Sequence, residues 1–191
     1  MIRSIAFLVF PRLTLLDLVG PYDALRRVRT MNVDASVHWR FVGTQAQLTD
    51  DTGLPVHVDG VLEPLSRFDL LVVPGGFGAD ALRTDRNFLT WLQTWGADKP
   101  VASVCSGALL LGEAGFLTGL PATTHHTRHE ALKPLCREVV TDRRVVDAGR
   151  VITSGGVTAG IDLGLHLVAR FWGEAARNKI ARQMEWPLAA R

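Results

Sequence analysis

Two kinds of hydrophobic pattern alternate along the chain. Short apolar runs predict strands at residues 2–10, 37–42, 69–73, 100–104, 122–124, 139–146 and 150–153. Apolar residues at helical spacing predict helices at residues 79–95, 108–114, 126–135, 157–172 and 174–185. Several of the strand runs are almost continuously apolar, which is typical of strands covered on both faces. The alternation predicts an α/β fold with a mostly parallel sheet and helices on both of its faces.

The segment after the first predicted strand carries an apolar stripe formed by Leu18, Tyr22 and Leu25. Pro21 is expected in the first turn of a helix there, because its missing N–H costs nothing at that position. A short hairpin is expected within residues 54–61, where apolar alternation meets turn residues. No linker, repeat or low-complexity segment divides the chain, so residues 1–191 are expected to form a single domain.

The apolar content raises the question of a membrane, because the mean hydropathy is +0.15. The longest stretch without a charged residue, residues 114–127, contains Pro121. It is shorter than the run of about 18 apolar residues that a spanning helix needs. We therefore expect no transmembrane segment, and we expect the apolar surplus in the core and in a contact between subunits.

Charge and cysteine content narrow the classes of partner and of cellular compartment that remain possible. Lys and Arg number 21 against 19 Asp and Glu, and no block of five basic residues occurs, so nucleic acid is not an expected partner. The N-terminal apolar run stops at Pro11 and Arg12 without a cleavage site, which favours a buried strand over a signal peptide. With only Cys105 and Cys136 there is no disulfide framework, and a cytoplasmic protein is expected.

The junction between a predicted strand and a predicted helix carries Cys105, followed by Ser106 and Gly107. This layout is typical of a nucleophile elbow, in which a sharp turn lifts the side chain out of the sheet. Amides at the helix start would lower the pKa of the thiol and favour the reactive thiolate. The alternative is a buried structural cysteine. Cys136, between Leu135 and Arg137, is interpreted as a packing residue.

A glycine pair, Gly75-Gly76, follows another predicted strand, so its amides can approach a ligand closely. Ligands of parallel sheets bind outside the carboxyl ends of the strands, where Cys105 also lies. Backbone N–H groups of Gly76 and Ser106 are therefore candidates for an oxyanion hole that faces the sulfur. The alternative for the glycine pair is a plain turn.

Proton transfer has two candidates, Asp17 and His125. Asp17 follows the first strand within an apolar stretch, where desolvation would raise its pKa toward neutrality. The alternative interpretation is that Asp17 is an exposed residue at the start of a helix. His125 follows a short predicted strand and is a candidate to line the same mouth. The six histidines show no metal-ligand spacing, so no metal is expected.

Five ordered motifs resemble the ThiJ/PfpI superfamily, whose members are related to class I glutamine amidotransferases. The resemblance covers nearly the whole chain. The motifs are L-L-D-L-V-G-P-Y-D-A-L (15–25), V-P-G-G-F-G (73–78), S-V-C-S-G-A-L-L-L-G-E-A-G-F-L (103–117), A-T-T-H (122–125) and T-S-G-G-V-T-A-G-I-D-L-G-L (153–165). The resemblance implies a flavodoxin-like three-layer sandwich with a nucleophile elbow at Cys105, and a homodimer whose active sites lie near the interface.

Within the superfamily, the motifs are similar to those of isocyanide hydratases and of the ligand-binding domains of AraC-type regulators. The hydratase resemblance implies that Cys105 is the nucleophile and that Asp17 is the acid–base residue. Ser106 stands where a peptidase-like branch has His, which argues against proteolysis. A deglycase-like branch uses a Glu on the first helix, in the region that here holds Asp17. His126 stands where hydratases often carry Trp, so the pocket and the substrate are expected to differ.

The leading hypothesis is a hydratase without metal or organic cofactor that adds water to a small-molecule isocyanide through a thioimidate on Cys105. The second enzymatic hypothesis is glyoxalase or deglycase chemistry on small dicarbonyls with the same cysteine. The third is a non-enzymatic small-molecule or redox sensor related to regulator ligand domains, because an activated thiolate is easily oxidised. No helix-turn-helix pattern follows the motifs, so an intact AraC-type regulator is not expected.

Overall fold

A seven-stranded sheet forms the centre of the protein, which a computed structural model describes over residues 1–187. Its strand order is β10-β11-β7-β6-β1-β2-β5. Neighbouring strands run parallel except β10, which is antiparallel to β11. The strands are β1 (Ser4–Val9), β2 (His38–Gly43), β5 (Gly60–Val61), β6 (Leu70–Val73), β7 (Val101–Val104), β10 (Val145–Asp147) and β11 (Val151–Ser154).

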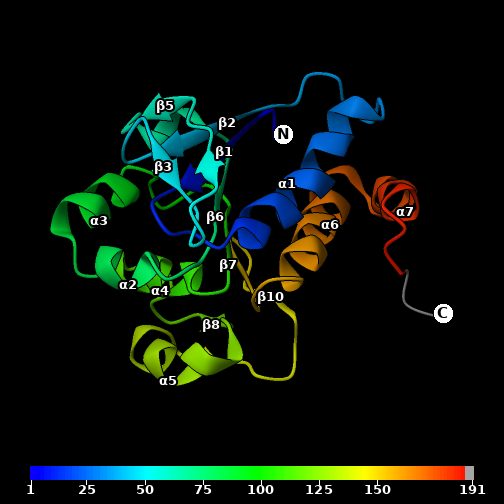
Figure 1. Ribbon diagram of the computed structural model, residues 1–191. Coiled ribbons are helices and arrows are strands. Elements are labelled where there is room, and N and C mark those ends of the chain that lie inside the picture. Colours follow the sequence, from blue (N-terminus) through cyan, green and yellow to red (C-terminus); the bar gives the residue numbers. More distant parts are fainter. Residues whose placement is uncertain (188–191) are drawn as a thin grey trace.

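Helices cover both faces of this sheet. Figure 1 shows three of them on one side, namely α1 (Leu15–Thr30), α6 (Ala159–Trp172) and α7 (Glu174–Gln183). On the other side lie α2 (Ala79–Leu82), α3 (Arg86–Gln93) and α4 (Gly107–Glu113). All residues of β1, β6, β7 and β11 are buried between these layers. The predicted three-layer α/β fold with a mostly parallel sheet is therefore confirmed. Within residues 1–187, no helix has both the length and the apolar character needed to cross a bilayer.

The predicted helix over residues 79–95 is wrong in one respect, because the structure divides it into α2 and α3. Asp85 causes the break: its carboxylate accepts hydrogen bonds from the amides of Asn87 at 2.9 Å and Phe88 at 3.2 Å. These are the N-terminal amides of α3, so Asp85 caps a new helix. A periodic apolar face continues through both helices, which explains the merged prediction.

The segment predicted as one helix over residues 126–135 is also broken. It consists of a 3₁₀ turn (His126–Arg128), the short helix α5 (His129–Leu132) and a second 3₁₀ turn (Lys133–Leu135). Pro134 lies in the second turn and removes a backbone donor. Flanking strands β8 (Pro121–Ala122) and β9 (Glu138–Val139) pair with each other and not with the main sheet.

The hairpin expected within residues 54–61 does not form, because its two strands pair with other strands. The strand β4 (Pro55–Val56) pairs antiparallel with β3 (Leu48–Thr49), and β5 instead adds to the edge of the main sheet beside β2. At the other edge of the main sheet, β10 and β11 are antiparallel and joined through Gly149, whose φ is +82°.

Helices α1 and α6 cross at close range, and this crossing fixes the start of α1 beside the sheet. A Cβ on Gly20 would lie 3.2 Å from the backbone of Gly160, and one on Gly164 would lie 2.8 Å from Pro21 Cα. Pro21 is inside α1 and not in its first turn, which corrects the expectation from sequence. Its missing N–H leaves the carbonyl of Asp17 without the usual helical donor.

We predict that Gly164→Ala lowers the free energy of unfolding by about 1–3 kcal/mol, because backbone atoms of Pro21 must move. The gain in helix propensity, about 1 kcal/mol, is too small to offset this strain. Urea denaturation checks the change. Gly155→Ala is the control, because its Cβ would have only an ordinary 3.5 Å contact with Ala159. A Gly164→Ala variant at least as stable as wild type would contradict the close crossing.

Candidate active site

Cys105 occupies a strained turn between β7 and α4. Its φ is +57°, a left-handed conformation that is uncommon for residues other than glycine. The turn is held by hydrogen bonds: the Cys105 amide donates to the carbonyls of Ser154 at 3.2 Å and Gly155 at 3.1 Å. Thr124 Oγ1 donates to the Cys105 carbonyl at 2.6 Å. The predicted elbow is therefore present, and its strain is sustained by two neighbouring segments.

Small residues around the elbow are required by space. A Cβ on Gly75 would lie 2.6 Å from the Ser106 amide nitrogen and 2.8 Å from Cys105 Cβ. A Cβ on Gly107 would lie 2.4 Å from the Val73 carbonyl oxygen. Both are backbone collisions that no side-chain movement relieves. The loop after β6 and the elbow after β7 thus pack directly against each other at the carboxyl ends of adjacent strands.

Asp17 is fully buried beside the elbow, in the first turn of α1. Its Oδ1 accepts from the Val157 amide at 2.7 Å and its Oδ2 accepts from the Gly75 amide at 3.2 Å. Burial raises the pKa of this carboxyl from 3.8 to about 6, against the lowering effect of the Val157 amide, the Cys105 side chain and the Gly75 amide. The Asp17 carboxyl is thus tuned toward proton exchange near neutrality.

The segment just before α6 supplies contacts that sequence reasoning did not assign. Val157 has φ +58°, which is strained for a β-branched residue, and this conformation aims its amide at Asp17. A Cβ on Gly156 would lie 3.0 Å from Cys105 Sγ and 2.5 Å from the His125 ring, so only glycine lets both side chains approach. The signal in the sequence that points to this contact is the Gly155-Gly156 pair before the helix predicted at residues 157–172.

The thiol of Cys105 is predominantly protonated at neutral pH. Burial and the negative charge of Asp17 together raise its pKa from 9.0 to about 12, because the Ser106 amide offsets them only in part. The expectation that the start of α4 would lower this pKa is therefore wrong. Burial and an adjacent carboxylate outweigh one amide at the start of a seven-residue helix. The resting pair is a thiol next to a carboxylate.

One of the two amides predicted to form the oxyanion hole is already hydrogen-bonded within the protein. The Gly76 amide donates to Ser106 Oγ at 2.9 Å, and Ser106 Oγ donates to the Gly76 carbonyl at 3.1 Å. The Gly76 amide therefore does not face a ligand, which corrects the sequence expectation. The Gly75 amide is bound to Asp17. The Ser106 amide is the member of the predicted hole that interacts with the sulfur.

His125 lies at the mouth of the site, with its ring against Gly156. Its Nδ1 is 3.3 Å from the Thr127 amide and 2.8 Å from Thr127 Oγ1. Because a backbone amide can only donate, Nδ1 is the acceptor, and the neutral ring carries its proton on Nε2. Burial lowers the pKa of His125, and the nearby charges of His126, Arg128 and His129 lower it further. His125 is thus a neutral hydrogen-bond donor near the thiol.

An open cavity of about 260 Å³ leads to the thiol. Asp17 and Gly75 do not line this cavity. Its lining consists of Thr14, Gly76, Phe77, Cys105, Ser106, His125, Thr127, Arg128 and Val157. Among residues 1–187, no group of three or more His, Cys, Asp or Glu residues is arranged to hold a metal ion. The arrangement places a cysteine thiol at a cavity of small-molecule size, with a titratable carboxyl behind the thiol.

Comparisons with known proteins identify the family of this chain and several of its relatives. The model of the DJ-1/PfpI family matches residues 3–170. Isonitrile hydratase of Pseudomonas putida is 38% identical over 189 residues, which covers 97% of this chain and 79% of that protein. The HTH-type transcriptional regulator CdhR of Pseudomonas aeruginosa is 29% identical over 93% of this chain and 53% of its own length. The crystal structure of a THiJ/PfpI family protein from Pseudomonas syringae superposes with a TM-score of 0.87 at 31% identity, covering 100% of this chain and 77% of that one.

We predict that the buried Asp17 carboxyl makes folding stability fall as pH rises. Its folded pKa of about 6 exceeds the ordinary 3.8, so its contribution is complete below 3.8 and is lost as pH rises through 6. Relative to Asp17→Ala, wild type should lose up to about 3 kcal/mol between pH 4 and pH 7. Urea denaturation across this range measures the difference.

Asp69 provides a control, because its contribution to folding stability should change with pH in the opposite direction. Hydrogen bonds from Ser4 and Arg3 outweigh the effect of its burial and hold the pKa of the Asp69 carboxyl below its usual value. Wild type should therefore gain stability relative to Asp69→Ala as pH rises toward 4. A difference between wild type and Asp17→Ala that does not change with pH would show that Asp17 titrates normally.

Proposed function

The chain belongs to the DJ-1/PfpI family, and from this premise we propose that it is a cysteine-dependent isocyanide hydratase that converts an isocyanide and water into an N-formyl amine. The observation that carries the proposal is the Cys105 thiol, which lines a small cavity and lies next to the buried Asp17 carboxylate. The 38% identity to isonitrile hydratase over 97% of the chain supports it. Other relatives are transcriptional regulators, so activity is decided by experiment.

The first half of the reaction requires sulfur and hydrogen to add to the same carbon. In the resting pair, Asp17 accepts the thiol proton while Cys105 Sγ attacks the terminal carbon of the isocyanide. The protonated Asp17 then delivers this proton to the carbon, which gives the thioimidate R–N=CH–S–Cys105. One thiol proton is consumed and one C–H bond is formed, so a protonated thiol beside a basic carboxylate is a suitable starting state.

The second half releases the product and restores the pair. Asp17 takes a proton from water as the water oxygen attacks the thioimidate carbon, and it passes this proton to the nitrogen, which leaves Asp17 ionised again. The adduct then collapses: its O–H proton passes through Asp17 to the sulfur and the C–S bond breaks. The products are R–NH–CHO and the Cys105 thiol. The Ser106 amide and the Nε2–H of His125 are the donors near the reacting atoms.

The protonated thiol argues against a redox sensor, because oxidation proceeds through the thiolate and burial disfavours that form. Both Cys105 and Cys136 are free, which fits our proposal that the protein works in the reducing cytoplasm. A glyoxalase reaction on small dicarbonyls would use the same cysteine, and its substrate enters the test below as a competitor.

A second copy of the chain is the partner that we propose. An apolar hollow of about 510 Å³ between α1 and α6 is lined by Leu16, Val19, Gly20, Tyr22, Asp23, Arg26, Ile161 and Met184. At the mouth of the active-site cavity, Phe77 is 59% exposed and Val157 is 38% exposed. These apolar positions favour a homodimer that covers the α1–α6 face beside the site.

We predict that purified protein converts phenyl isocyanide to formanilide, measured by chromatography. Cys105→Ala should abolish turnover because the nucleophile is lost, and Asp17→Ala should lower kcat by about 10²–10⁴-fold. The rate should rise with pH through about 6, because Asp17 must be ionised to accept the thiol proton. Cys136→Ala is the matched control and should keep full activity.

Failure of wild type to form formanilide from phenyl isocyanide would refute the hydratase proposal for aromatic isocyanides. Formation of lactate from methylglyoxal, lost in Cys105→Ala, would instead favour glyoxalase chemistry. Full activity of Asp17→Ala would leave the nucleophile assignment intact and would refute the acid–base role of this carboxyl.

We predict a dimer of twice 20.9 kDa in sedimentation equilibrium. Ile161→Arg should give a folded monomer, because it places a charge in the apolar hollow of the α1–α6 face. Leu54→Arg is the control, because Leu54 is 51% exposed outside this face. A wild-type monomer, or dissociation by Leu54→Arg alone, would contradict an interface on α1 and α6.

A further inference from the structure

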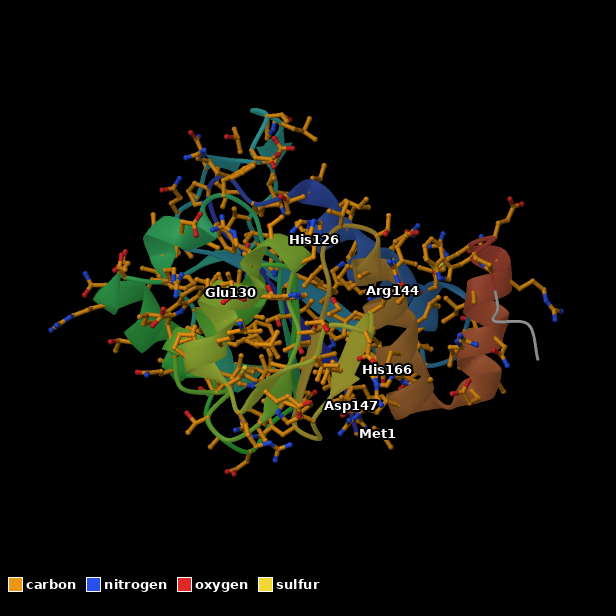
Figure 2. The ribbon with its side chains drawn as sticks, turned by 90° about the horizontal axis from the view of Figure 1, so that it is seen from below. Met1, His126, Glu130, Arg144, Asp147 and His166 are labelled. Carbon is orange, nitrogen blue, oxygen red and sulfur yellow. The ribbon has the colours of Figure 1, made fainter. Side chains whose placement is uncertain are left out.

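A second cavity lies on the other side of His125 from the thiol. Its volume is about 300 Å³, and His125 lines both cavities. Figure 2 shows two of its residues, with His126 on the 3₁₀ turn before α5 and Arg144 near α6. The remaining lining residues are Thr123, Thr124, His129, Thr141, Asp142, Arg143, Gly155, Gly156 and Ala159. Three segments that are distant in sequence therefore enclose a polar hollow next to the active site.

The lining of this cavity is mainly basic. It contains three histidines and two arginines against one carboxylate, Asp142. Arg144 is fixed in place, because its Nε donates to Asp162 at 2.6 Å and its Nη2 donates to Thr158 Oγ1 at 3.1 Å. Among residues 1–187, Arg143 makes no side-chain hydrogen bond or ion pair, so its guanidinium is available to a ligand.

The positive field of this region acts on His125. The charges of His126, Arg128 and His129 each lower its pKa. The ring of His126 stacks on that of His125 with centroids 4.3 Å apart. Within the described residues, neither His126 nor His129 has a hydrogen-bond partner for its ring nitrogens. Two imidazoles thus stand beside the cavity with unused donors and acceptors.

The floor of the cavity is polar and buried. Thr123 is 2% exposed and its amide donates to Thr153 Oγ1 at 2.8 Å, and the Thr124 hydroxyl donates to the Cys105 carbonyl at 2.6 Å. The first residue of the 14-residue helix α6, Ala159, also lines the cavity, so the positive end of the α6 dipole adds to the field.

We propose that this second cavity binds an oxyanion, namely a carboxylate or a phosphate group. Arg143 supplies a charged donor, and His126 and His129 supply imidazole donors. The anion has two sources: an acidic group carried by the substrate whose isocyanide reacts at Cys105, or a free anion that binds beside the site. His125 separates the two cavities, and the thiol lies against the same glycine as the His125 ring.

Inorganic phosphate is the probe for the binding site itself. The phosphate titration does not depend on the proposed function. Calorimetric titration at pH 6.5 should show saturable binding, and NMR should show the ring resonances of His126 and His129 moving with it. Arg143→Gln should weaken binding by about tenfold, because it removes a charge-assisted hydrogen bond. Arg86→Gln, the same change at an exposed residue of α3, should leave the affinity unchanged.

Two outcomes would overturn the site. The first is the absence of saturable phosphate binding to wild type. The second is binding that Arg143→Gln and His129→Gln both leave unchanged, because the anion would then lie elsewhere. Both positions are on surface segments away from the elbow, so the unfolding free energies of the variants should match wild type and confirm that they are folded.

A comparison of two isocyanides, one with a carboxylate and one with its methyl ester, distinguishes the two sources of the anion. This experiment rests on the proposed function. If the acidic group belongs to the substrate, Arg143→Gln should lower kcat/KM for isocyanoacetate by about tenfold and leave that for its methyl ester unchanged. Phosphate should then compete only with isocyanoacetate. Equal turnover of both compounds by wild type and variant, with phosphate still bound, assigns the site to a free anion. If neither isocyanide reacts, the hydratase proposal fails, and the phosphate titration still decides the site.

Discussion

The geometry of the site depends on one buried carboxylate. Asp17 is fully enclosed, and its two oxygens accept amides from two separate connections, the loop after β6 and the segment before α6. A buried carboxylate without these donors would be strongly disfavoured, so the amides must stay where they are. The strained φ of Val157 and the close α1–α6 crossing both serve this placement.

The same carboxylate determines the state of the cysteine. Its negative charge, added to the effect of burial, keeps the thiol protonated, although Cys105 lies at the start of a helix. Thiol and carboxylate together hold one proton that either can release. For a reaction that adds sulfur and hydrogen to one carbon, this pair is better suited than a free thiolate, because the proton travels with the nucleophile.

Prediction from sequence succeeded where the signal was local. Apolar runs identified the buried strands, and a cysteine between a strand and small residues identified the elbow, because packing of adjacent residues decides both. It failed where distant segments meet. The Val157 amide is 140 residues from Asp17, and the Gly75 amide is 58 residues away, so neither contact has a sequence pattern. The Gly76 amide was assigned to a ligand because the partner that occupies it, Ser106 Oγ, lies 30 residues further on.

The segment that was hardest to predict, between β8 and α5, is also the one that lines both cavities. Backbone amides hold Asp17 and the elbow, so those contacts tolerate many side chains as long as the turns survive. By contrast, side chains from the irregular segment between β8 and α5 form the wall between the two cavities, with His125 shared and His126 stacked on it. Substitution there changes the lining without disturbing the proton-holding pair. In the proposed hydratase, reaction chemistry and substrate choice would thus rest on different parts of the chain, the first on backbone geometry at strand ends and the second on the short irregular segment between β8 and α5.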